Sequence, residues 1–161
     1  MRIQRLTTNP DFPLPVRSTA FAGAWDLHAA IPHPITLAPG EQAMIGTGYA
    51  WEIPPGKVGL LLPRSGKGSK EGAVLGNLVG LIDSDYRGEV TACIWNRSKE
   101  RMNVAEDGSL HEAVQTPLVI QPGERFCQLL IVQSYIDELE LVDQLSKTAR
   151  GNGGFGSTGA A

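Results

Sequence analysis

The 161-residue sequence has few of the residues that build metal centres and disulfide frameworks, with two cysteines and three histidines. His28, His33 and His111 lie on separate segments, so the converging ligands of a zinc site or a Ser/His/Asp triad are missing. Cys93 and Cys127 each lie inside an apolar run, where a buried free thiol is the commonest use of cysteine. The sequence therefore predicts neither a zinc ion held by the protein nor a disulfide scaffold.

Long hydrophobic runs and an excess of positive charge are also lacking. No stretch approaches the roughly 20 apolar residues of a membrane-spanning helix, and the N-terminus carries no apolar signal region. The net charge of −3 disfavours a general nucleic-acid or anionic-membrane binder, because such proteins present a broad basic face. We therefore expect a cytoplasmic protein that binds neither nucleic acid nor membrane directly and recognises phosphate only locally.

Glycine and proline are abundant, with 19 and 11 residues, and they separate short segments rich in Val, Ile, Leu and aromatic side chains. This pattern is typical of strands joined by turns. We expect strands in RIQRL, AMIGTGYAWEI, VGLLLPR, AVLGNLVGLI, EVTACIWN, PLVI, RFCQLLIVQSYI and ELELV. In EVTACIWN, residues 89–96, both alternating faces are largely apolar, which predicts a strand that is buried on both sides.

Helical patterning is weak. No long window has a 3.6-residue period, and the one helix that we expect is a short one beginning at Ser65. The chain length suits a single domain, so the sequence predicts an all-β barrel or sandwich with one short helix. The polar segment 99–116 interrupts the rhythm of strands as a surface excursion, for which a solvated loop without function is the simplest account.

The first candidate site is PRSG, residues 63–66, where an apolar run ends and the short helix begins. Free backbone N–H groups there, together with Arg64, Ser65 and Gly66, would suit an anion. The segment is not a Walker loop, because Lys67 is followed by glycine instead of serine or threonine. Taken alone, a helix-capping Ser65 with Arg64 in a surface ion pair is the slightly simpler interpretation.

The second candidate is GNLVGLIDSDYRG, residues 76–88, which predicts a β-hairpin with an apolar first arm and an acidic tip. Asp83 directly follows the apolar arm, where partial desolvation would let its carboxylate hold and deprotonate a water molecule. An ordinary Asp-Ser-Asp turn is the alternative, and a metal site at Asp83 and Asp85 is disfavoured because no His or Cys supports it. Asn77 could pair with a pyrimidine edge or serve a turn, and Tyr86 could stack on a sugar or fill the core.

Two further segments complete the set of candidates. Gln128 in GERFCQ, residues 123–128, shares a strand face with apolar neighbours and needs a polar partner: another subunit, the backbone or a ligand phosphate. The C-terminal RGNGGFGSTG, residues 150–159, places Arg150, Phe155 and two hydroxyl groups among glycines. This composition suits either a nucleotide clamp or a disordered terminus.

Taken together and in this order, these four segments resemble motifs of the trimeric dUTP nucleotidohydrolases (dUTPases). The fifth motif of that family, A-G-x-D-L-x-A, is matched by GAWDLHA, residues 23–29, in which Ala24 stands where the family usually has glycine. This departure affects the expected backbone geometry more than it affects Asp26. The resemblance implies a jelly-roll-like fold of the β-clip type, a homotrimer, and three active sites assembled from pieces of several subunits.

The resemblance also implies hydrolysis of dUTP to dUMP and pyrophosphate, which keeps uracil out of DNA and supplies dUMP for thymidylate synthesis. Asp83 would activate the water that attacks the α-phosphorus. Mg²⁺ would be held by the triphosphate and water without direct protein ligands, and Asp26 would at most support the site indirectly. The implied substrate-binding residues are Arg64, Ser65, Gly66, Asn77, Gly80, Leu81, Ile82, Tyr86, Thr91, Gln128, Arg150, Phe155, Gly156, Ser157 and Thr158.

On this resemblance we expect a β-domain over residues 1–149, with 99–116 as a surface insertion, and a flexible glycine-rich arm over residues 150–161 that closes the active site. Related phage enzymes can carry extra segments near this insertion and can bind repressor proteins, so the insertion is a candidate contact for a regulatory partner. Two alternatives stay open: the dCTP deaminases, which share the fold, and a regulatory protein that uses the nucleotide site as a switch.

Overall fold

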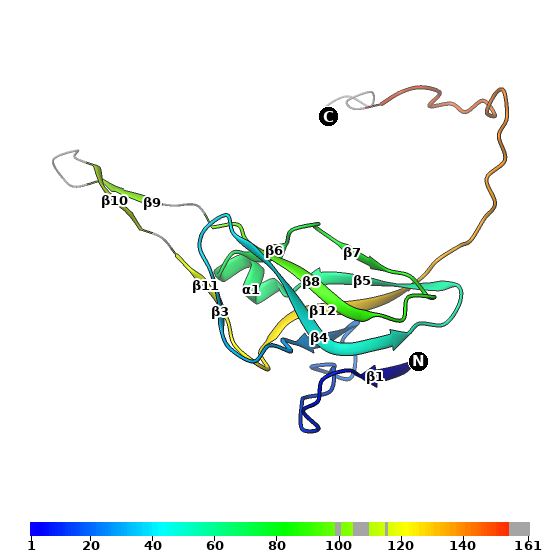
Figure 1. The fold of residues 1–161 in the computed structure, drawn as a ribbon. Helices are drawn as coiled ribbons and strands as arrows, with labels where there is room; N and C mark the ends of the chain where they lie inside the picture. The colour runs from blue at the N-terminus through cyan, green and yellow to red at the C-terminus, as the bar shows by residue number, and fades with distance from the viewer. Residues whose placement is uncertain (99–100, 105–109, 115, 155–161) are drawn as a thin grey trace.

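The computed structural model describes residues 1–98, 101–104, 110–114 and 116–154. Its elements are β1 (Arg2–Arg5), β2 (Ala24–His28), β3 (Ile35–Leu37), β4 (Gln42–Glu52), β5 (Lys57–Pro63), α1 (Ser65–Lys70), β6 (Ala73–Leu75), β7 (Gly80–Ile82), β8 (Glu89–Asn96), β9 (Arg101–Val104), β10 (Leu110–Val114), β11 (Leu118–Ile120) and β12 (Arg125–Gln133) (Figure 1). The expected fold class, all-β with one short helix, is confirmed, and the helix begins at Ser65 as predicted.

Two four-stranded antiparallel sheets form the body, in the orders β1-β4-β8-β6 and β2-β12-β5-β7. Two short ladders, β11-β3 and β10-β9, complete the described strands. The short helix α1 lies at one end of the body and contacts β6 (Figure 1). Because side chains alternate between the two faces of a strand, each sheet turns the side chains of one face toward the other sheet.

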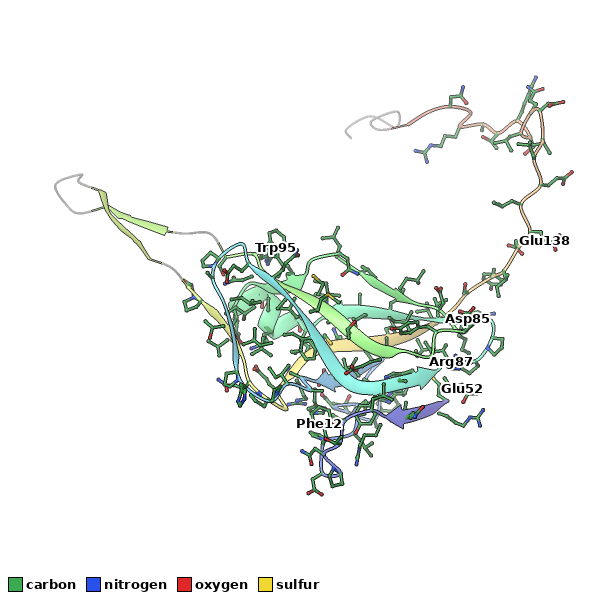
Figure 2. The ribbon with its side chains drawn as sticks, in the orientation of Figure 1. Phe12, Glu52, Asp85, Arg87, Trp95 and Glu138 are labelled. Atoms are coloured by element: carbon green, nitrogen blue, oxygen red, sulfur yellow. The ribbon has the colours of Figure 1, made fainter. Side chains whose placement is uncertain are left out.

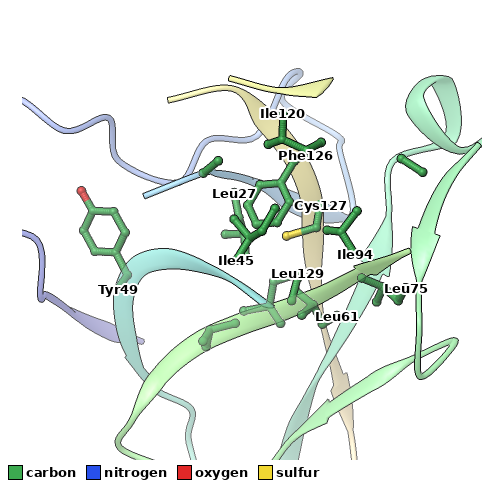
Figure 3. Packing of buried hydrophobic residues seen from close by; sticks show 14 of the residues in the cluster. Leu27, Ile45, Tyr49, Leu61, Leu75, Ile94, Ile120, Phe126, Cys127 and Leu129 are labelled. Carbon is green, nitrogen blue, oxygen red and sulfur yellow. The ribbon is translucent and has the colours of Figure 1, made fainter. Parts of the chain in front are cut away.

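The hydrophobic core lies between the two sheets (Figure 3). Its side chains are aliphatic and aromatic, and both sheets contribute to it. Ile45 and Ile94 come from the first sheet, and Leu61, Phe126 and Leu129 come from the second; none is more than 2% exposed. Burial of this apolar surface is the main stabilising contribution to the body, and it holds the strand ends that carry the candidate residues.

Both cysteines are free thiols, as the sequence predicts. Cys127 is completely buried in the core, whereas Cys93 is half-buried. Burial raises the pKa of the Cys127 thiol well above its usual range, so this thiol stays protonated at neutral pH. Cys127 is therefore a packing residue.

Most predicted strands are present, but the pattern differs from the structure at several places. The run AVLGNLVGLI holds two strands, β6 and β7, because Leu78 adopts a left-handed conformation (φ 65°) in a turn between them. The segment ELELV is not a strand, and Leu139 and Leu141 within it are fully exposed. The sequence pattern does not indicate β2 and β3, because β2 carries polar Asp26 and His28 and β3 is very short.

The predicted hairpin over residues 76–88 and the predicted two-sided burial of β8 are both wrong. β7 pairs with β5, whereas β8 pairs with β4 and β6, so the loop between β7 and β8 crosses from one sheet to the other. Val90 and Ile94 of β8 are buried, but Trp95 on the opposite face is 36% exposed. The reason is that only one face of this sheet lies against the core in the single chain.

Two segments leave the body (Figure 1). β9 and β10 pair with each other, and this ladder projects from one end of the body, within the predicted excursion 99–116. After β12 the chain runs away from the sheets, and Glu138 lies on this outlying stretch (Figure 2). Residues 135–152 are all exposed. Of the helices in the described residues, none is long and apolar enough to cross a membrane.

Candidate active site

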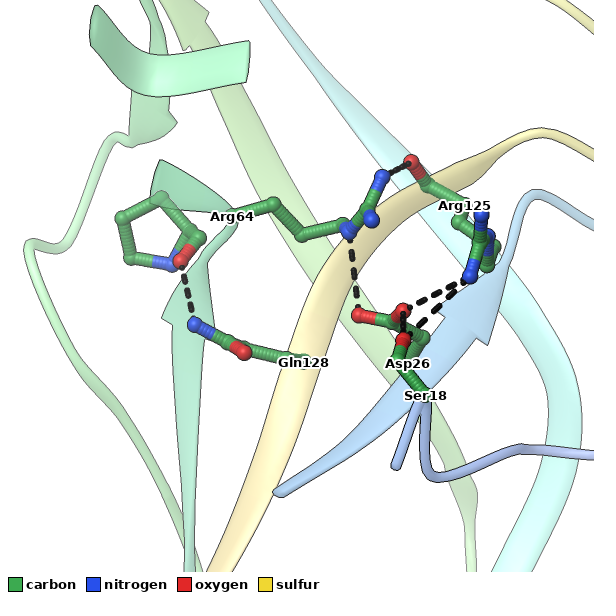
Figure 4. A network of polar contacts seen from close by, with 6 residues as sticks. Ser18, Asp26, Arg64, Arg125 and Gln128 are labelled. Atoms are coloured by element: carbon green, nitrogen blue, oxygen red, sulfur yellow. Dashed lines mark hydrogen bonds and ion pairs between the residues drawn. The ribbon is translucent and has the colours of Figure 1, made fainter. Parts of the chain in front are cut away.

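Asp26, on β2, is the centre of a polar network that joins separate segments of the chain (Figure 4). Its Oδ1 atom accepts a hydrogen bond from Nε of Arg64 at 2.9 Å. Its Oδ2 atom accepts hydrogen bonds from Oγ of Ser18 at 2.9 Å and from Nη1 of Arg125 at 3.2 Å. Asp26 is only 7% exposed, so its charge needs these partners. The carboxylate therefore fixes the orientation of both arginines.

Strand pairing brings these residues together. β12 lies between β2 and β5, so Gln128 of β12 is paired with Asp26 on one side and with Leu62 on the other. β5 ends at Pro63, and Arg64 therefore emerges beside the start of β12, where its Nη1 atom donates to the Arg125 carbonyl at 3.1 Å. Arg64 is thus in an ion pair, but its partner Asp26 is buried and not at the surface as the simpler interpretation expected. The remaining guanidinium N–H groups can donate to a ligand.

Arg64 occupies the N-cap position of α1 with an extended backbone (φ −80°, ψ 134°). No side chain of the described residues caps the helix, so the capping interpretation of Ser65 is wrong. Ser65 and Gly66 are both exposed. An added Cβ at Gly66 would have no atom within 4 Å, so the backbone of Gly66 is open to the approach of a ligand.

A cavity of about 270 Å³ opens beside this network. Two arginines and one carboxylate leave the network with a net positive charge, which suits an anionic ligand. Gln128, at the edge of the cavity, donates from Nε2 to the Pro63 carbonyl at 3.0 Å. Of the polar partners considered for Gln128, the backbone is therefore one. The lining residues are Ser18, Ala22, Gly23, Ala24, Asp26, Arg64, Ser65, Gly66 and Gln128.

Asp83 begins the loop between β7 and β8, which is held in shape by Tyr86. The backbone N–H of Tyr86 donates to the Asp83 carbonyl at 3.2 Å, and its hydroxyl donates to the Glu89 carbonyl at 3.1 Å. The side chains of Asp83 and Tyr86 are exposed. The expected partial desolvation of Asp83 and the core-filling interpretation of Tyr86 are therefore wrong for the single chain, in which both residues are exposed.

Asp83 and Arg64 do not share a site within one chain. Ile82 pairs with Gly59, so Asp83 lies level with Val58 near the start of β5, whereas Arg64 follows the end of β5. About six residues of extended strand separate these levels, or about 20 Å. The cavity beside Asp83, of about 390 Å³, has no lining residue in common with the cavity beside Arg64.

The turn before β7 exposes backbone and side-chain polar groups. The Asn77 side chain is exposed, and the Asn77 carbonyl accepts a hydrogen bond from the Val79 N–H at 2.7 Å. An added Cβ at Gly80 would lie 3.0 Å from Cβ of Leu61, so β7 and β5 approach closely there. Of the other residues expected to contact the base, Leu81 is exposed and Ile82 and Thr91 are half-buried.

His28 lies at the end of β2, near the network but outside it. Its ring is 8% exposed and stands edge-on to the ring of Phe12, with centroids 6.4 Å apart. Burial, followed by the nearby charge of Arg125, lowers the pKa of His28 below its usual value. Its Nδ1 atom has no hydrogen-bond partner among the described residues. The imidazole is therefore neutral at pH 7.

The described residues of the C-terminal arm, 150–154, do not line either cavity. Arg150 lies on the exposed stretch, where its Nε atom donates to the Gly153 carbonyl at 2.8 Å. Phe155, Gly156, Ser157 and Thr158 lie outside the described residues. Their expected roles over the nucleotide stay predictions.

Carboxylates near the cavities do not form a metal cage. In the described ranges, no group of three or more His, Cys, Asp or Glu side chains could hold a metal ion. Both oxygens of Asp26 already accept hydrogen bonds from Arg64, Arg125 and Ser18, so Asp26 does not present a free oxygen pair.

Sequence reasoning missed Ser18 and Arg125 as members of the network. Arg125 lies inside the GERFCQ segment, at the start of a predicted strand. Its positive charge in a segment expected to bind an anion could have indicated that it belongs to the site. Ser18 has no such signal, because it reaches Asp26 only through the bridge between Val16 and Asp26.

Comparisons with known proteins identify the family. The dUTPase family model matches residues 11–108 and 109–159. The deoxyuridine 5'-triphosphate nucleotidohydrolase of Aeromonas hydrophila is 42% identical over 150 residues, covering 92% of this chain and 88% of that protein. The dUTPase of Staphylococcus bacteriophage 80alpha, solved with dUpNHpp, has a TM-score of 0.81 and 31% identity and covers 99% of this chain and 98% of its own.

A mutant dUTPase from phage phi11 of S. aureus, solved with a structural Mg(II) ion, has a TM-score of 0.72 and 28% identity. That alignment covers 89% of this chain and 96% of the phage chain. The family match spans nearly the whole sequence. It includes Arg64, Ser65, Gly66 and Gln128 at one cavity and Asp83, Ser84 and Asp85 at the other. The chain belongs to the dUTPase family.

Proposed function

We propose that this chain hydrolyses dUTP to dUMP and pyrophosphate in the cytoplasm, keeping uracil out of DNA and supplying dUMP for thymidylate synthesis. The observation that carries the proposal is the positively charged cavity beside Arg64, whose guanidinium is held by Asp26 while Ser65 and Gly66 stay exposed. A triphosphate is the kind of anion that such a cavity suits. The names of the Aeromonas and phage relatives support the same substrate.

The active enzyme is a homotrimer in which each active site combines the Arg64 cavity of one subunit with the Asp83 loop of another. The separation of about 20 Å within one chain supports this arrangement, because Asp83 cannot reach a phosphate that Arg64 of the same chain holds. Both groups are accessible for such pairing. Residues 1–149 form the β-domain, and residues 150–161 form an arm that closes over the bound nucleotide.

Arg64, Ser65, Gly66 and Gln128 hold the phosphates in this site. The guanidinium offers N–H groups in a planar fork, the hydroxyl and the open backbone at Gly66 add neutral donors, and the Gln128 amide lies at the cavity edge. Together they neutralise the triphosphate and align the α-phosphorus for attack. Asp26 contributes by orienting Arg64.

Asp83 acts as the general base. It holds a water molecule and removes its proton as the oxygen attacks the α-phosphorus in line with the bridging oxygen of the β-phosphate. A new P–O bond forms in dUMP, the bond from the α-phosphorus to the bridging oxygen breaks, and pyrophosphate leaves with that oxygen. The proton taken by Asp83 then passes to solvent.

The base and sugar are read by the segment around β7. Asn77 and the backbone at Gly80, Leu81 and Ile82, with Thr91 on β8, the next strand along the chain, recognise uracil and leave no room for the methyl group of thymine. Tyr86 packs against the deoxyribose and disfavours a ribose 2′-hydroxyl. The close approach of Gly80 to Leu61 and the ordered Tyr86 hydroxyl support a fixed binding surface.

The arm supplies the remaining contacts. Arg150, Ser157 and Thr158 meet the γ-phosphate, and Phe155 covers the uracil ring, with Gly156 allowing the backbone to approach the ligand. The exposure of residues 135–152 supports a segment that is free to reach another subunit. Closure of such an arm excludes bulk water from the reaction.

The substrate is the Mg²⁺ complex of dUTP, in which the triphosphate oxygens and water hold the ion. Bound in this way, Mg²⁺ neutralises phosphate charge in the transition state.

A second role is a regulatory contact through residues 99–116. The β9–β10 ladder projects from the body, and a phage relative of similar fold controls transfer of virulence genes by a G protein-like mechanism. Deletion of 99–116 should leave dUTP hydrolysis intact and remove binding of a regulatory protein partner. Loss of hydrolysis would instead make the ladder part of the enzyme's structure.

Subunit complementation tests the proposed enzyme. Arg64→Ala and Asp83→Asn should each abolish turnover, and co-refolding them in equal amounts should restore about one quarter of the wild-type activity. In randomly mixed trimers, one site in four combines an intact Arg64 from one subunit with an intact Asp83 from another. A mixture that stays inactive while forming mixed trimers would contradict the shared site, and full activity of Asp83→Asn would contradict the base assignment.

A further inference from the structure

Lys67 is a buried lysine in α1 that the proposed chemistry does not use. Its side chain is 6% exposed, whereas Lys70 on the same helix is exposed. Its Nζ atom lies 2.8 Å from Oε2 of Glu71 and 2.5 Å from Oε1 of Glu124. A lysine is seldom buried unless it is paired, because the desolvation of its charge must be offset. The partners of Lys67 therefore indicate what it does.

Glu124 connects this lysine to the turn that precedes β12. Its Oε2 atom accepts the backbone N–H of Gln121 at 2.8 Å, and its carbonyl accepts the N–H of Ala29 at 2.8 Å. The Glu124 side chain is 29% exposed and that of Glu71 is 50% exposed. The contact with Glu124 is therefore the better shielded of the two and the stronger electrostatically.

Lys67 keeps its charge in this setting. Burial is the largest single influence and lowers its pKa, but the hydrogen bonds and charges of Glu124 and Glu71 together raise the pKa above its usual value. The Lys67–Glu124 contact is thus an ion pair across the whole neutral range.

α1 needs contacts with the body to hold its position. α1 has six residues, and a helix of that length is not stable by itself. Within α1, all of whose residues are described, only Lys67 and Gly68 are buried. Glycine has no side chain, so Lys67 provides the one buried side chain that anchors the helix to the body.

We propose that the Lys67–Glu124 ion pair is a positioning contact that fixes α1 against the turn before β12 and so holds Ser65 and Gly66 beside Gln128. The proposal rests on the proposed function, in which these three residues contact the substrate's phosphates. Arg64 and Asp26 fix the residue before the helix, and Lys67 and Glu124 fix its first turn. Two separate ion pairs thereby hold one phosphate-binding segment.

Steady-state kinetics on the full-length enzyme test the proposal, with Lys67→Met compared with Lys67→Arg and with Lys70→Met as the matched control. Lys67→Met should raise KM for dUTP about tenfold and change kcat less than about twofold. Lys67→Arg should recover most of the loss, and Lys70→Met should resemble the wild type. A purely structural lysine would lower the active fraction, which reduces kcat at constant KM; that result, or an unchanged KM, would overturn the proposal.

Glu124→Gln provides a second variant if Lys67→Met does not fold, because glutamine keeps an acceptor for the Gln121 N–H. It should also raise KM, and the double variant Lys67→Met/Glu124→Gln should raise KM no further than the more severe single variant. If the increase in KM of the double variant equals the product of the two single increases, the two residues do not act as a pair.

Amide hydrogen exchange separates failure of this proposal from failure of the proposed function. If the wild-type enzyme does not hydrolyse dUTP, the function is wrong, but the Gly68 amide, which donates to the Arg64 carbonyl at 2.8 Å, should still exchange about tenfold faster in Lys67→Met than in Lys70→Met. Equal exchange rates in the two variants would overturn the positioning role whatever the activity.

Discussion

The Oδ1 atom of Asp26 lies 2.9 Å from Nε of Arg64, a residue 38 positions away, and this contact joins β2 to the residue that precedes α1. The Asp26 side chain is 9% exposed and that of Arg64 is 31% exposed, so the guanidinium is oriented from the buried side and open on the other. The carboxylate therefore serves to present a cation to the cavity. This role differs from that of Asp83, whose exposed carboxylate is available for chemistry.

Replacing Asp26 by asparagine tests this orienting role. We expect Asp26→Asn to lower the free energy of unfolding by about 2 kcal/mol, because two arginines lose their shared counter-charge. KM for dUTP should rise as Arg64 loses its fixed orientation. Asp11→Asn, at an exposed site, should change stability by less than about 0.5 kcal/mol. Urea unfolding and KM measurements check both effects, and an unchanged KM would contradict the role.

Gly88 is required by the position of Tyr86. An added Cβ at Gly88 would lie 2.4 Å from the Tyr86 hydroxyl oxygen and 2.6 Å from Cζ, so the ring must move and lose its hydrogen bond to Glu89. We expect Gly88→Ala to lower kcat/KM for dUTP about tenfold and to weaken the preference for dUTP over UTP. If the variant keeps wild-type discrimination between these nucleotides, Tyr86 does not read the sugar.

His28 should make stability depend on pH. Its pKa is lower in the folded chain, so the unfolded chain binds more protons as the pH falls below about 6.5. Its contribution is complete above that pH and is lost as the pH falls toward the folded pKa. The free energy of unfolding should therefore decrease between about pH 7.5 and 5.5 more steeply in the wild type than in His28→Gln. His33→Gln, at an exposed site, should keep the wild-type slope, and identical slopes in all three proteins would refute the assignment.

Removal of the C-terminal arm should lower activity and leave thermal stability unchanged. Residues 141–152 are exposed, so a chain ending at Ala149 should melt at the wild-type temperature. We expect its kcat/KM for dUTP to fall about 100-fold, because contacts to the γ-phosphate and the base are lost. Lys147→Gln, in the same exposed stretch, is the matched control and should retain activity. A fully active truncated enzyme would show that the arm is only a linker.

Local patterns predicted the strands, and pairing between strands determined the site. The apolar alternation in residues 125–133 and the turn residues around them were sufficient to place β12. The sequence also indicated the segments around Arg64, Asp83 and Gln128 as candidates, and their roles stay predictions. No local pattern shows that β7 pairs with β5 and not with β8, because that choice depends on contacts between distant segments. No local pattern predicts the contact of Ser18 with Asp26 either, because one isolated bridge between distant segments brings them together. The strand predicted at ELELV failed because strand propensity forms a sheet only where an edge is available.

Pyrophosphate release from dUTP, UTP, dTTP and dCTP, measured side by side with Mg²⁺, tests the central claim most directly. A site in which Arg64 and Gln128 hold phosphates, Asn77 and Thr91 face uracil, and Tyr86 covers the deoxyribose should hydrolyse dUTP at least about 100-fold faster than the other three nucleotides. Equal rates with dUTP and UTP, or release of ammonia from dCTP, would contradict the account.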